Sequence, residues 1–328
     1  MEMIRLNLNE NPFGFPLDII KRVLENLTEE DIARYHDTPT PELKRCLLSY
    51  IKDTTRTDFI DEHWITVTSG SDEGITILMS MRPKRLVFFP PTYFWYYTFA
   101  ENMNLHYEEF PLINDMGIPE VELRRDDMVF IPNPNNPTGH LFEEEELERI
   151  FKSGATVVVD EAYFEFSWIS SIKYLKKYDN LIILRTFSKA FAFAGQRFGY
   201  AIAHPKWIEK MEKFKQPYNV GILTQMLVIE SLKNRWLFFG RIKEIEMERE
   251  RLKEALERLG FNVFPSYTNF LYFKTKNARG LVKELEKRGI LVRELWNGIR
   301  VSIGKKFEND LFIKTLSELI SRGEGVAE

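Results

Sequence analysis

Short runs of apolar and β-branched residues alternate with helical patterns over roughly residues 64–205. The runs are continuous rather than alternating, which is typical of strands that are covered on both faces of a sheet. The predicted strands are WITVTSG (64–70), RLVFFPP (85–91), DMVFIPNP (127–134), TVVVDEAY (156–163), LIILRTFSK (181–189) and GYAIAH (199–204). Between them lie helical patterns such as EEEELERIF (143–151), whose acidic start suits a helix N-terminus. This order predicts an α/β fold with a mostly parallel central sheet and with ligands at the carboxyl ends of its strands.

The pattern changes beyond residue 220. Residues 221–259 are predicted to be helical and increasingly charged, with Gly260 as the stop. Later strands are predicted within 261–273, 289–295 and 298–304, with helices at 277–288 and 306–321 and a frayed tail at 322–328. We therefore expect a large α/β domain at 31–235 and a smaller α+β C-terminal domain at 236–328, joined by a long helix. The segment 1–30 is expected to pack near the small domain.

Composition limits the class of protein. A chain of 328 residues that is 44% hydrophobic can bury a core large enough for two domains. The net charge of −4 comes without a basic face, so nothing suggests nucleic-acid binding. Cys46 is the only cysteine, which excludes an intrachain disulfide framework and fits a reducing compartment. The start, MEMIRLNLNENP, has no apolar signal core, and no later run is long enough to span a bilayer. We expect a cytoplasmic protein without membrane contact.

Chemically useful side chains follow the predicted strands. Lys189 lies among small and apolar residues in TFSKAFAFAGQRFG (186–199), which is unusual surroundings for a solvated amine. The same stretch holds Thr186, Ser188 and Arg197, and the other strand ends supply Asp160 and Tyr163 in VVVDEAY, Asn136 in NPNNPTG, Ser71 and Asp72 in TSGSDEG, and Tyr93 in PPTYFWY. One sheet edge would thus collect an amine, a carboxylate, an amide, a phenol, an aromatic ring and a phosphate cradle.

Each of these residues has a simpler explanation when taken alone. An aspartate after a strand is usually a turn or cap residue, and Asn, Pro and Gly favour turns for backbone reasons. Their joint placement at strand ends favours a site instead. Pyridoxal phosphate needs this set: an amine for its aldehyde, a carboxylate for its ring nitrogen, donors for its 3-oxygen and an anion cradle for its phosphate.

The chain resembles the fold-type I pyridoxal-phosphate aminotransferases, and most closely the histidinol-phosphate aminotransferase family. The resemblance runs through nearly the whole chain. It rests on NLNENPFGFP, RYHDTP, TSGSDEG, FFPPTY, PNPNNPTG, VVVDEAYFEF, RTFSKAFAFAGQRFGY, EMERERLKEAL, TNFLYF and IRVSIG. It implies a pyridoxal-phosphate-dependent aminotransferase of histidine biosynthesis that moves an amino group from histidinol phosphate to 2-oxoglutarate.

The resemblance also assigns roles to residues. Lys189 would bind the cofactor covalently and move the substrate proton, Asp160 would pair with the ring nitrogen, and Tyr163 would bind the 3-oxygen. These three residues would be catalytic. The other residues that would contact the cofactor are Ser71, Asp72, Tyr93, Asn136, Thr186, Ser188 and Arg197. No metal is implied.

For the substrate, the resemblance implies that Arg300 in GIRVSIG grips the α-carboxylate, and that Arg293 in ILVREL can meet a substrate phosphate. Asn11, within the motif Asn9–Pro12, would line the substrate side. Tyr35 in RYHDTP would reach the cofactor phosphate of a neighbouring subunit, which implies a homodimer with shared active sites.

Alternatives stay open at the level of substrate and reaction. Family members usually carry a longer segment before the LNLNENP stretch, with a tyrosine that covers the substrate phosphate, and the sequence shows no counterpart of it. Aromatic residues near the expected mouth would suit an imidazole or an aromatic amino acid equally: Phe13, Phe15, Phe94, Trp95 and Tyr97. An aromatic aminotransferase is therefore an alternative, as is a threonine-phosphate decarboxylase of the same fold. A non-catalytic ligand-binding module is the third.

Overall fold

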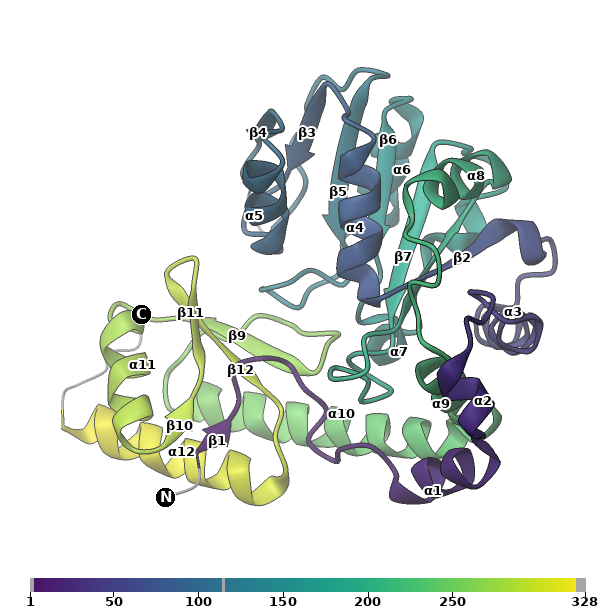
Figure 1. The fold of residues 1–328 in the computed structure, drawn as a ribbon. Helices are drawn as coiled ribbons and strands as arrows, with labels where there is room; N and C mark the ends of the chain where they lie inside the picture. Colours follow the sequence, from purple (N-terminus) through teal and green to yellow (C-terminus); the bar gives the residue numbers. More distant parts are fainter. Residues whose placement is uncertain (1–2, 114–115, 323–328) are drawn as a thin grey trace.

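The computed structural model describes residues 3–113 and 116–322, which form two lobes (Figure 1). The larger lobe is built around a seven-stranded sheet. In spatial order its strands are β2 (Ile65–Thr68), β8 (Gly199–Ala203), β7 (Leu181–Thr186), β6 (Thr156–Asp160), β5 (Asp127–Pro132), β3 (Arg85–Phe88) and β4 (Tyr107–Glu109). Of these seven, β8 alone runs antiparallel to its neighbours, so the carboxyl ends of the other six meet at one edge.

Helices cover both faces of this sheet. They are α3 (Pro41–Thr55), α4 (Gly70–Ser80), α5 (Trp95–Asn102), α6 (Glu144–Lys152), α7 (Phe164–Ser167), α8 (Pro205–Phe214) and α9 (Ile222–Lys233), with 3-10 turns η1 (Glu62–Trp64) and η2 (Ser171–Tyr174). The sheet is packed against two hydrophobic clusters, and neighbouring strand residues belong to different ones. Val129 packs into the cluster that includes α3 and α6, and Phe130 packs into the cluster that includes α4 and α5. This explains why the strands are apolar without alternation.

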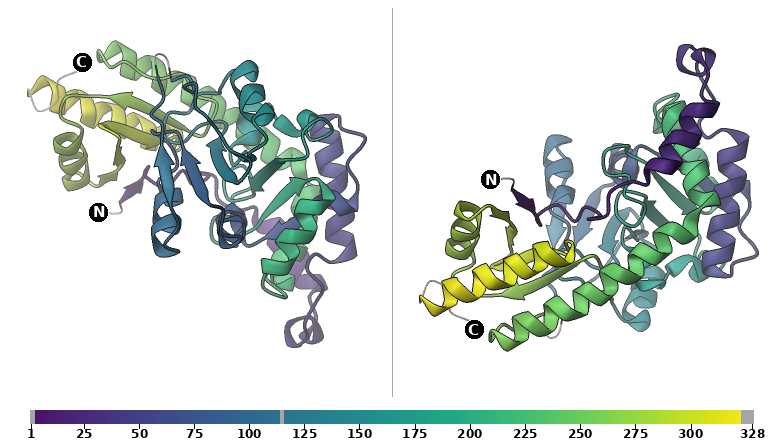
Figure 2. Two further views of the ribbon diagram at one scale, coloured as in Figure 1. Left: turned by 90° about the horizontal axis from the view of Figure 1, so that it is seen from above. Right: turned by 90° about the horizontal axis from the view of Figure 1, so that it is seen from below.

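The smaller lobe follows the long helix α10 (Arg235–Arg258), which runs beneath both lobes in Figure 1. Its antiparallel sheet has the order β11 (Arg293–Leu295), β12 (Gly298–Ser302), β9 (Phe270–Lys274). Two helices complete it, α11 (Ala278–Lys287) and α12 (Lys306–Ser321), and Figure 2 shows α12 alongside α10.

The N-terminal segment joins the two lobes. Its strand β1 (Ile4–Arg5) pairs in parallel with β10 (Ile290–Leu291) of the smaller lobe. The chain then crosses to the larger lobe, where α1 (Leu17–Asn26) packs against α9 and is followed by α2 (Glu29–Ala33), as the purple trace in Figure 1 shows. The segment therefore contacts both lobes rather than the smaller one alone.

The six strands predicted at 64–205 are confirmed, although each ends one to three residues before the end of its predicted range. The helical region 221–259 is divided at Asn234 into α9 and α10, and Gly260 follows the helix end with a φ of 89°, a left-handed conformation that suits glycine. Within 261–273 the strand starts only at Phe270, and Val263 forms an isolated bridge with Phe273.

The borders 31–235 and 236–328 remain an interpretation of this arrangement. The tail expected at 322–328 lies outside the described residues except for Arg322. None of the helices in the described part of the chain combines the length and apolarity that crossing a membrane requires.

Candidate active site

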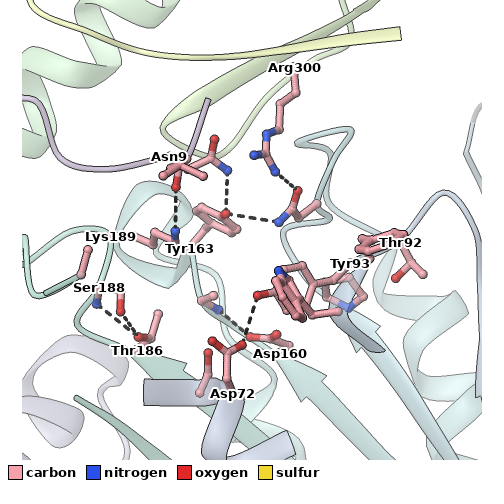
Figure 3. A pocket seen from close by; sticks show the side chains of 18 of the residues that line it. Asn9, Asp72, Thr92, Tyr93, Asp160, Tyr163, Thr186, Ser188, Lys189 and Arg300 are labelled. Atoms are coloured by element: carbon pink, nitrogen blue, oxygen red, sulfur yellow. Dashed lines mark hydrogen bonds between the residues drawn. The ribbon is translucent and has the colours of Figure 1, made fainter. Parts of the chain in front are cut away.

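A pocket lies at the carboxyl edge of the large sheet, where the N-terminal segment and β11–β12 of the smaller lobe face it (Figure 3). The sequence predicted twelve of the residues that line it: Ser71, Asp72, Tyr93, Asn136, Asp160, Tyr163, Thr186, Ser188, Lys189, Arg197, Arg293 and Arg300. The residues expected at the strand ends and the two arginines of the smaller lobe thus line one pocket.

Lys189 follows β7 and extends into the pocket. Its Nζ donates a hydrogen bond to the carbonyl oxygen of Leu8, 3.3 Å away. Burial of the amine, and then the positive charge of Arg300, lower the pKa of Lys189 to about 8. Near neutral pH a larger fraction of this amine is therefore neutral than for a solvated lysine, as a nucleophile requires.

Asp160 ends β6 and is buried in the floor of the pocket. The Tyr96 hydroxyl donates to its Oδ2 at 3.1 Å, and the backbone N–H of Ala162 donates to its Oδ1 at 3.1 Å. Burial raises the pKa of Asp160 to about 7 despite these two donors. A buried carboxylate of this kind favours a cationic partner, such as a protonated ring nitrogen.

An anion cradle lies at the start of α4. The first turn of the helix contains Ser71 and Asp72, whose backbone N–H groups precede the regular helix bonds. Arg197 closes the cradle: it donates to Ser188 Oγ at 3.1 Å and pairs with Asp72 Oδ2 at 3.1 Å. Gly70 has a φ of 76°, a left-handed conformation that favours glycine, and a Cβ there would lie 2.5 Å from Arg197 Nη2, so it would displace the end of that side chain.

Above the floor, the Tyr163 hydroxyl is the centre of a polar group. It accepts hydrogen bonds from Asn9 Nδ2 at 2.9 Å and from Asn136 Nδ2 at 3.4 Å (Figure 3). Tyr93 lies across the pocket and donates from its hydroxyl to Asp72 Oδ1 at 3.1 Å. Thr186 donates to Ser188 Oγ at 3.0 Å, so it supports a residue of the cradle.

The roof of the pocket carries two arginines. Arg300 on β12 is buried and donates to Asn136 Oδ1 at 2.7 Å and to the carbonyl oxygen of Asn7 at 2.9 Å. Its buried Nε has no hydrogen-bond partner among the described residues. Burial lowers the pKa of Arg300 to about 10, with a smaller contribution from Arg293, its direct cross-strand partner on β11. Two like charges placed opposite each other repel, and an anion bound between them would relieve that repulsion.

Two expected site residues lie elsewhere. Asn11 does not line the pocket: its Nδ2 donates to the Ala190 carbonyl at 3.1 Å, so it fastens the N-terminal segment to the loop of Lys189. Tyr35 is 82% exposed and stacks on Tyr218 with ring centroids 4.6 Å apart, outside the pocket of this subunit. A role across a subunit boundary remains a prediction.

Sequence reasoning gave no role to Tyr96 and none specific to Asn9. Tyr96 belongs to an aromatic run that is typical of a core helix, and its contact with Asp160 depends on how α5 packs. Asn9 has a left-handed φ of 55°, which turns its side chain into the pocket instead of that of Asn11. The only signal for either was its place inside a recognised motif.

The family model for aminotransferase class I and II matches residues 1–316. The chain belongs to this family. Among curated relatives, it is 44% identical over 313 residues to the histidinol-phosphate aminotransferase of Thermotoga maritima, covering 95% of this chain and 92% of that one.

Two solved structures show the same fold as this class I and II aminotransferase. The histidinol-phosphate aminotransferase of Sinorhizobium meliloti, solved in complex with pyridoxal-5'-phosphate, has a TM-score of 0.83 at 22% identity, covering 98% of this chain and 92% of that one. The L-threonine-O-3-phosphate decarboxylase of Porphyromonas gingivalis has a TM-score of 0.82 at 24% identity, covering 97% and 100%. The fold therefore does not separate the two reactions.

The pocket of this aminotransferase fits pyridoxal phosphate. Its lysine amine, its buried carboxylate and its helix-start cradle stand at different walls of one cavity, and Tyr163 and Asn136 lie between them. Gly70, which has no side chain, leaves room for Arg197 at the cradle. These are the groups that an aldehyde, a pyridine nitrogen, a phenolic oxygen and a phosphate require.

Proposed function

We propose that this pyridoxal-phosphate-dependent aminotransferase transfers the amino group of histidinol phosphate to 2-oxoglutarate, as a step of histidine biosynthesis. The identity to a curated histidinol-phosphate aminotransferase over nearly the whole chain supports this substrate. The pocket must then accept a phosphorylated donor and a dicarboxylate acceptor in turn.

The observation that carries the proposal is the pair Arg293 and Arg300. They are cross-strand partners that line the same pocket, and one of them has an unpaired buried donor. A phosphate monoester carries close to two negative charges at neutral pH and can accept from both guanidinium groups. The carboxylates of 2-oxoglutarate would use the same groups in the second half of the reaction.

Each residue has a task in this reaction. The cofactor, when bound, supplies an aldehyde that takes up the amino group and a ring that accepts electrons. Lys189 Nζ would take up and return the proton of the substrate α-carbon, which a pKa of about 8 permits near neutral pH. Asp160 would pair with the ring nitrogen, Tyr163 and Asn136 would bind the 3-oxygen, and Arg197 with the start of α4 would bind the phosphate.

The test is an absorption spectrum of the cofactor-loaded protein as single amino donors are added without acceptor. We expect histidinol phosphate to convert the band at far lower concentrations than histidinol, its phosphate-free match. If phenylalanine or tyrosine converts the band better than histidinol phosphate, the enzyme is an aromatic aminotransferase. Release of carbon dioxide from threonine phosphate would identify a decarboxylase, and a protein that holds cofactor but converts no donor would be a binding module.

We also propose that the enzyme works as a cytoplasmic homodimer. Tyr35 and Tyr218 form an exposed aromatic stack, which is unusual for a surface that faces only water. In a dimer, Tyr35 would reach the cofactor phosphate of the neighbouring subunit. Sedimentation should give twice the chain mass, and Tyr35→Phe should weaken cofactor binding; an active monomer would contradict both.

A further inference from the structure

The turn at Asn9 is held in place from three sides. Its backbone N–H donates to Ser302 Oγ at 2.8 Å, and its carbonyl oxygen accepts from Asn269 Nδ2 at 3.0 Å. Its side chain is only 1% exposed, and its φ of 55° is a conformation that asparagine, aspartate and glycine tolerate better than other residues. A residue held this firmly can fix the direction of a hydrogen bond.

The orientation of the Asn9 amide follows from its neighbours. Ser302 Oγ already accepts from the Asn9 backbone, and it donates its own hydrogen to Asn9 Oδ1 at 3.0 Å. The amide nitrogen must therefore face Tyr163. The same argument fixes Asn136, because its Oδ1 accepts from Arg300, which has no acceptor to offer.

The Tyr163 hydroxyl oxygen consequently accepts two hydrogen bonds. A phenolic oxygen has one hydrogen to donate, and with Asn9 and Asn136 both donating to it, that hydrogen has to leave in another direction. Among the described residues no acceptor within hydrogen-bond distance takes it. The remaining direction is the pocket that Tyr163 lines.

We propose that Asn9 is a positioning residue that forces the Tyr163 hydroxyl to donate its hydrogen into the pocket, to the phenolic oxygen of the cofactor. The inference rests on the proposed cofactor. It assigns to the N-terminal segment a part in tuning the cofactor, because the donated hydrogen stabilises the deprotonated oxygen. The charged groups that act on this tyrosine are Arg300, Asp160 and Asp72, and Lys189 Nζ lies 6.0 Å from the centre of its ring. The two carboxylates have no hydrogen to donate, Arg300 donates to Asn136 and Asn7, and Lys189 donates to Leu8.

Two substitutions of Asn9 separate its effect on the direction of the Tyr163 hydrogen bond from its effect on packing. Asn9→Asp keeps the left-handed turn and the bond from Ser302, but its second oxygen would accept from Tyr163 and draw the hydroxyl hydrogen away from the cofactor. Asn9→Gly keeps the turn and removes the amide. Lys21→Gln is the matched control, because it alters an exposed ion pair with Asp18 in the same N-terminal segment and neither residue lines the pocket.

The measurement is the pH at which the absorption band of the bound cofactor titrates, with no substrate present. We expect Asn9→Asp to raise this pH by about one unit or more, as loss of a hydrogen bond to a charged group implies. Asn9→Gly should raise it by less, and Lys21→Gln should leave it unchanged. Thermal unfolding of each variant reports whether it folds; should the aspartate variant not fold, the glycine variant decides.

A negative charge at residue 9 could act on the cofactor directly, so the measurement is repeated in the Tyr163→Phe background. The proposal requires the effect of Asn9→Asp to vanish there. An equal shift in both backgrounds, or no shift in the unsubstituted one, overturns it. A protein that shows no cofactor band at all contradicts the proposed function instead, so the two failures are distinguishable.

Discussion

The two ends of the pocket are built in opposite ways. At the cofactor end, Asp160 and Arg197 have their protein partners already, and both come from strand ends of one sheet. At the substrate end, Arg300 comes from the smaller lobe, bonds across to Asn136 of the larger one, and still has an unpaired buried donor. A rigid sheet edge suits a cofactor that stays, and a seam between lobes suits molecules that come and go.

The strongest way to break this comparison is to remove the amine at the cofactor end. We expect Lys189→Ala to lower turnover more than about a thousandfold, because covalent and proton-transfer roles are lost together. The assay is transamination with donor and acceptor both saturating. Since the other partners of the cofactor remain, the variant should still bind it non-covalently, and retained full activity would refute the assignment.

The same substitution at the arginine of each end, Arg300 and Arg197, sharpens the comparison. Arg300→Lys should raise the KM of amino donors and acceptors about 10- to 100-fold, because an ammonium cannot replace a planar fork. Arg197→Lys is the matched change at the other end and should weaken cofactor binding instead. Steady-state kinetics at saturating cofactor and cofactor titration measure the two effects. If both variants changed the same quantity, the two ends would not be independent.

Substitution of Arg293, the second arginine of the roof, should have a smaller effect that is confined to the choice of amino donor. Arg293→Gln is expected to reduce the preference for histidinol phosphate over histidinol about tenfold, as the loss of one charge-assisted contact implies. Half-reaction rates with the two donors give this ratio. An unchanged ratio would mean that Arg293 forms only a rim contact and that Arg300 alone binds the phosphate.

The smallest effect concerns stability without cofactor. The pKa of Asp160 is raised to about 7, so the folded protein holds a proton that the unfolded chain loses near pH 4, and stability falls as pH rises from 4 to 7. Asp160→Asn should therefore melt a few degrees higher than the unsubstituted protein at pH 7.5, with the difference vanishing near pH 4. Thermal unfolding of cofactor-free protein at the two pH values decides, and an equal difference at both would point to a packing effect.

Much of the cofactor end could be predicted because it is local in sequence. Asp160 and Lys189 each follow a continuous apolar strand, and parallel strands bring their carboxyl ends to one edge. The antiparallel course of β8 and the polar edge strand β4 could not be predicted, since register depends on pairing rather than on pattern.

The substrate end depends on contacts between distant segments. Asn9 lies next to Tyr163 across 154 residues, and Tyr96 meets Asp160 across 64. No spacing in the sequence reports such contacts, so Asn11 was expected where Asn9 is found. The proposed role of Tyr35 involves a second subunit, which the sequence of one chain cannot place.

The bond between Arg300 and the carbonyl oxygen of Asn7 spans 293 residues. During synthesis on the ribosome, the N-terminal segment therefore emerges long before its partner on β12, the last strand of the described chain. A ribosome that stalls or terminates early releases a chain with its lysine, its carboxylate and its cradle but without a roof. A chain that ends before β12 would therefore lack Arg300, the residue proposed to bind the substrate.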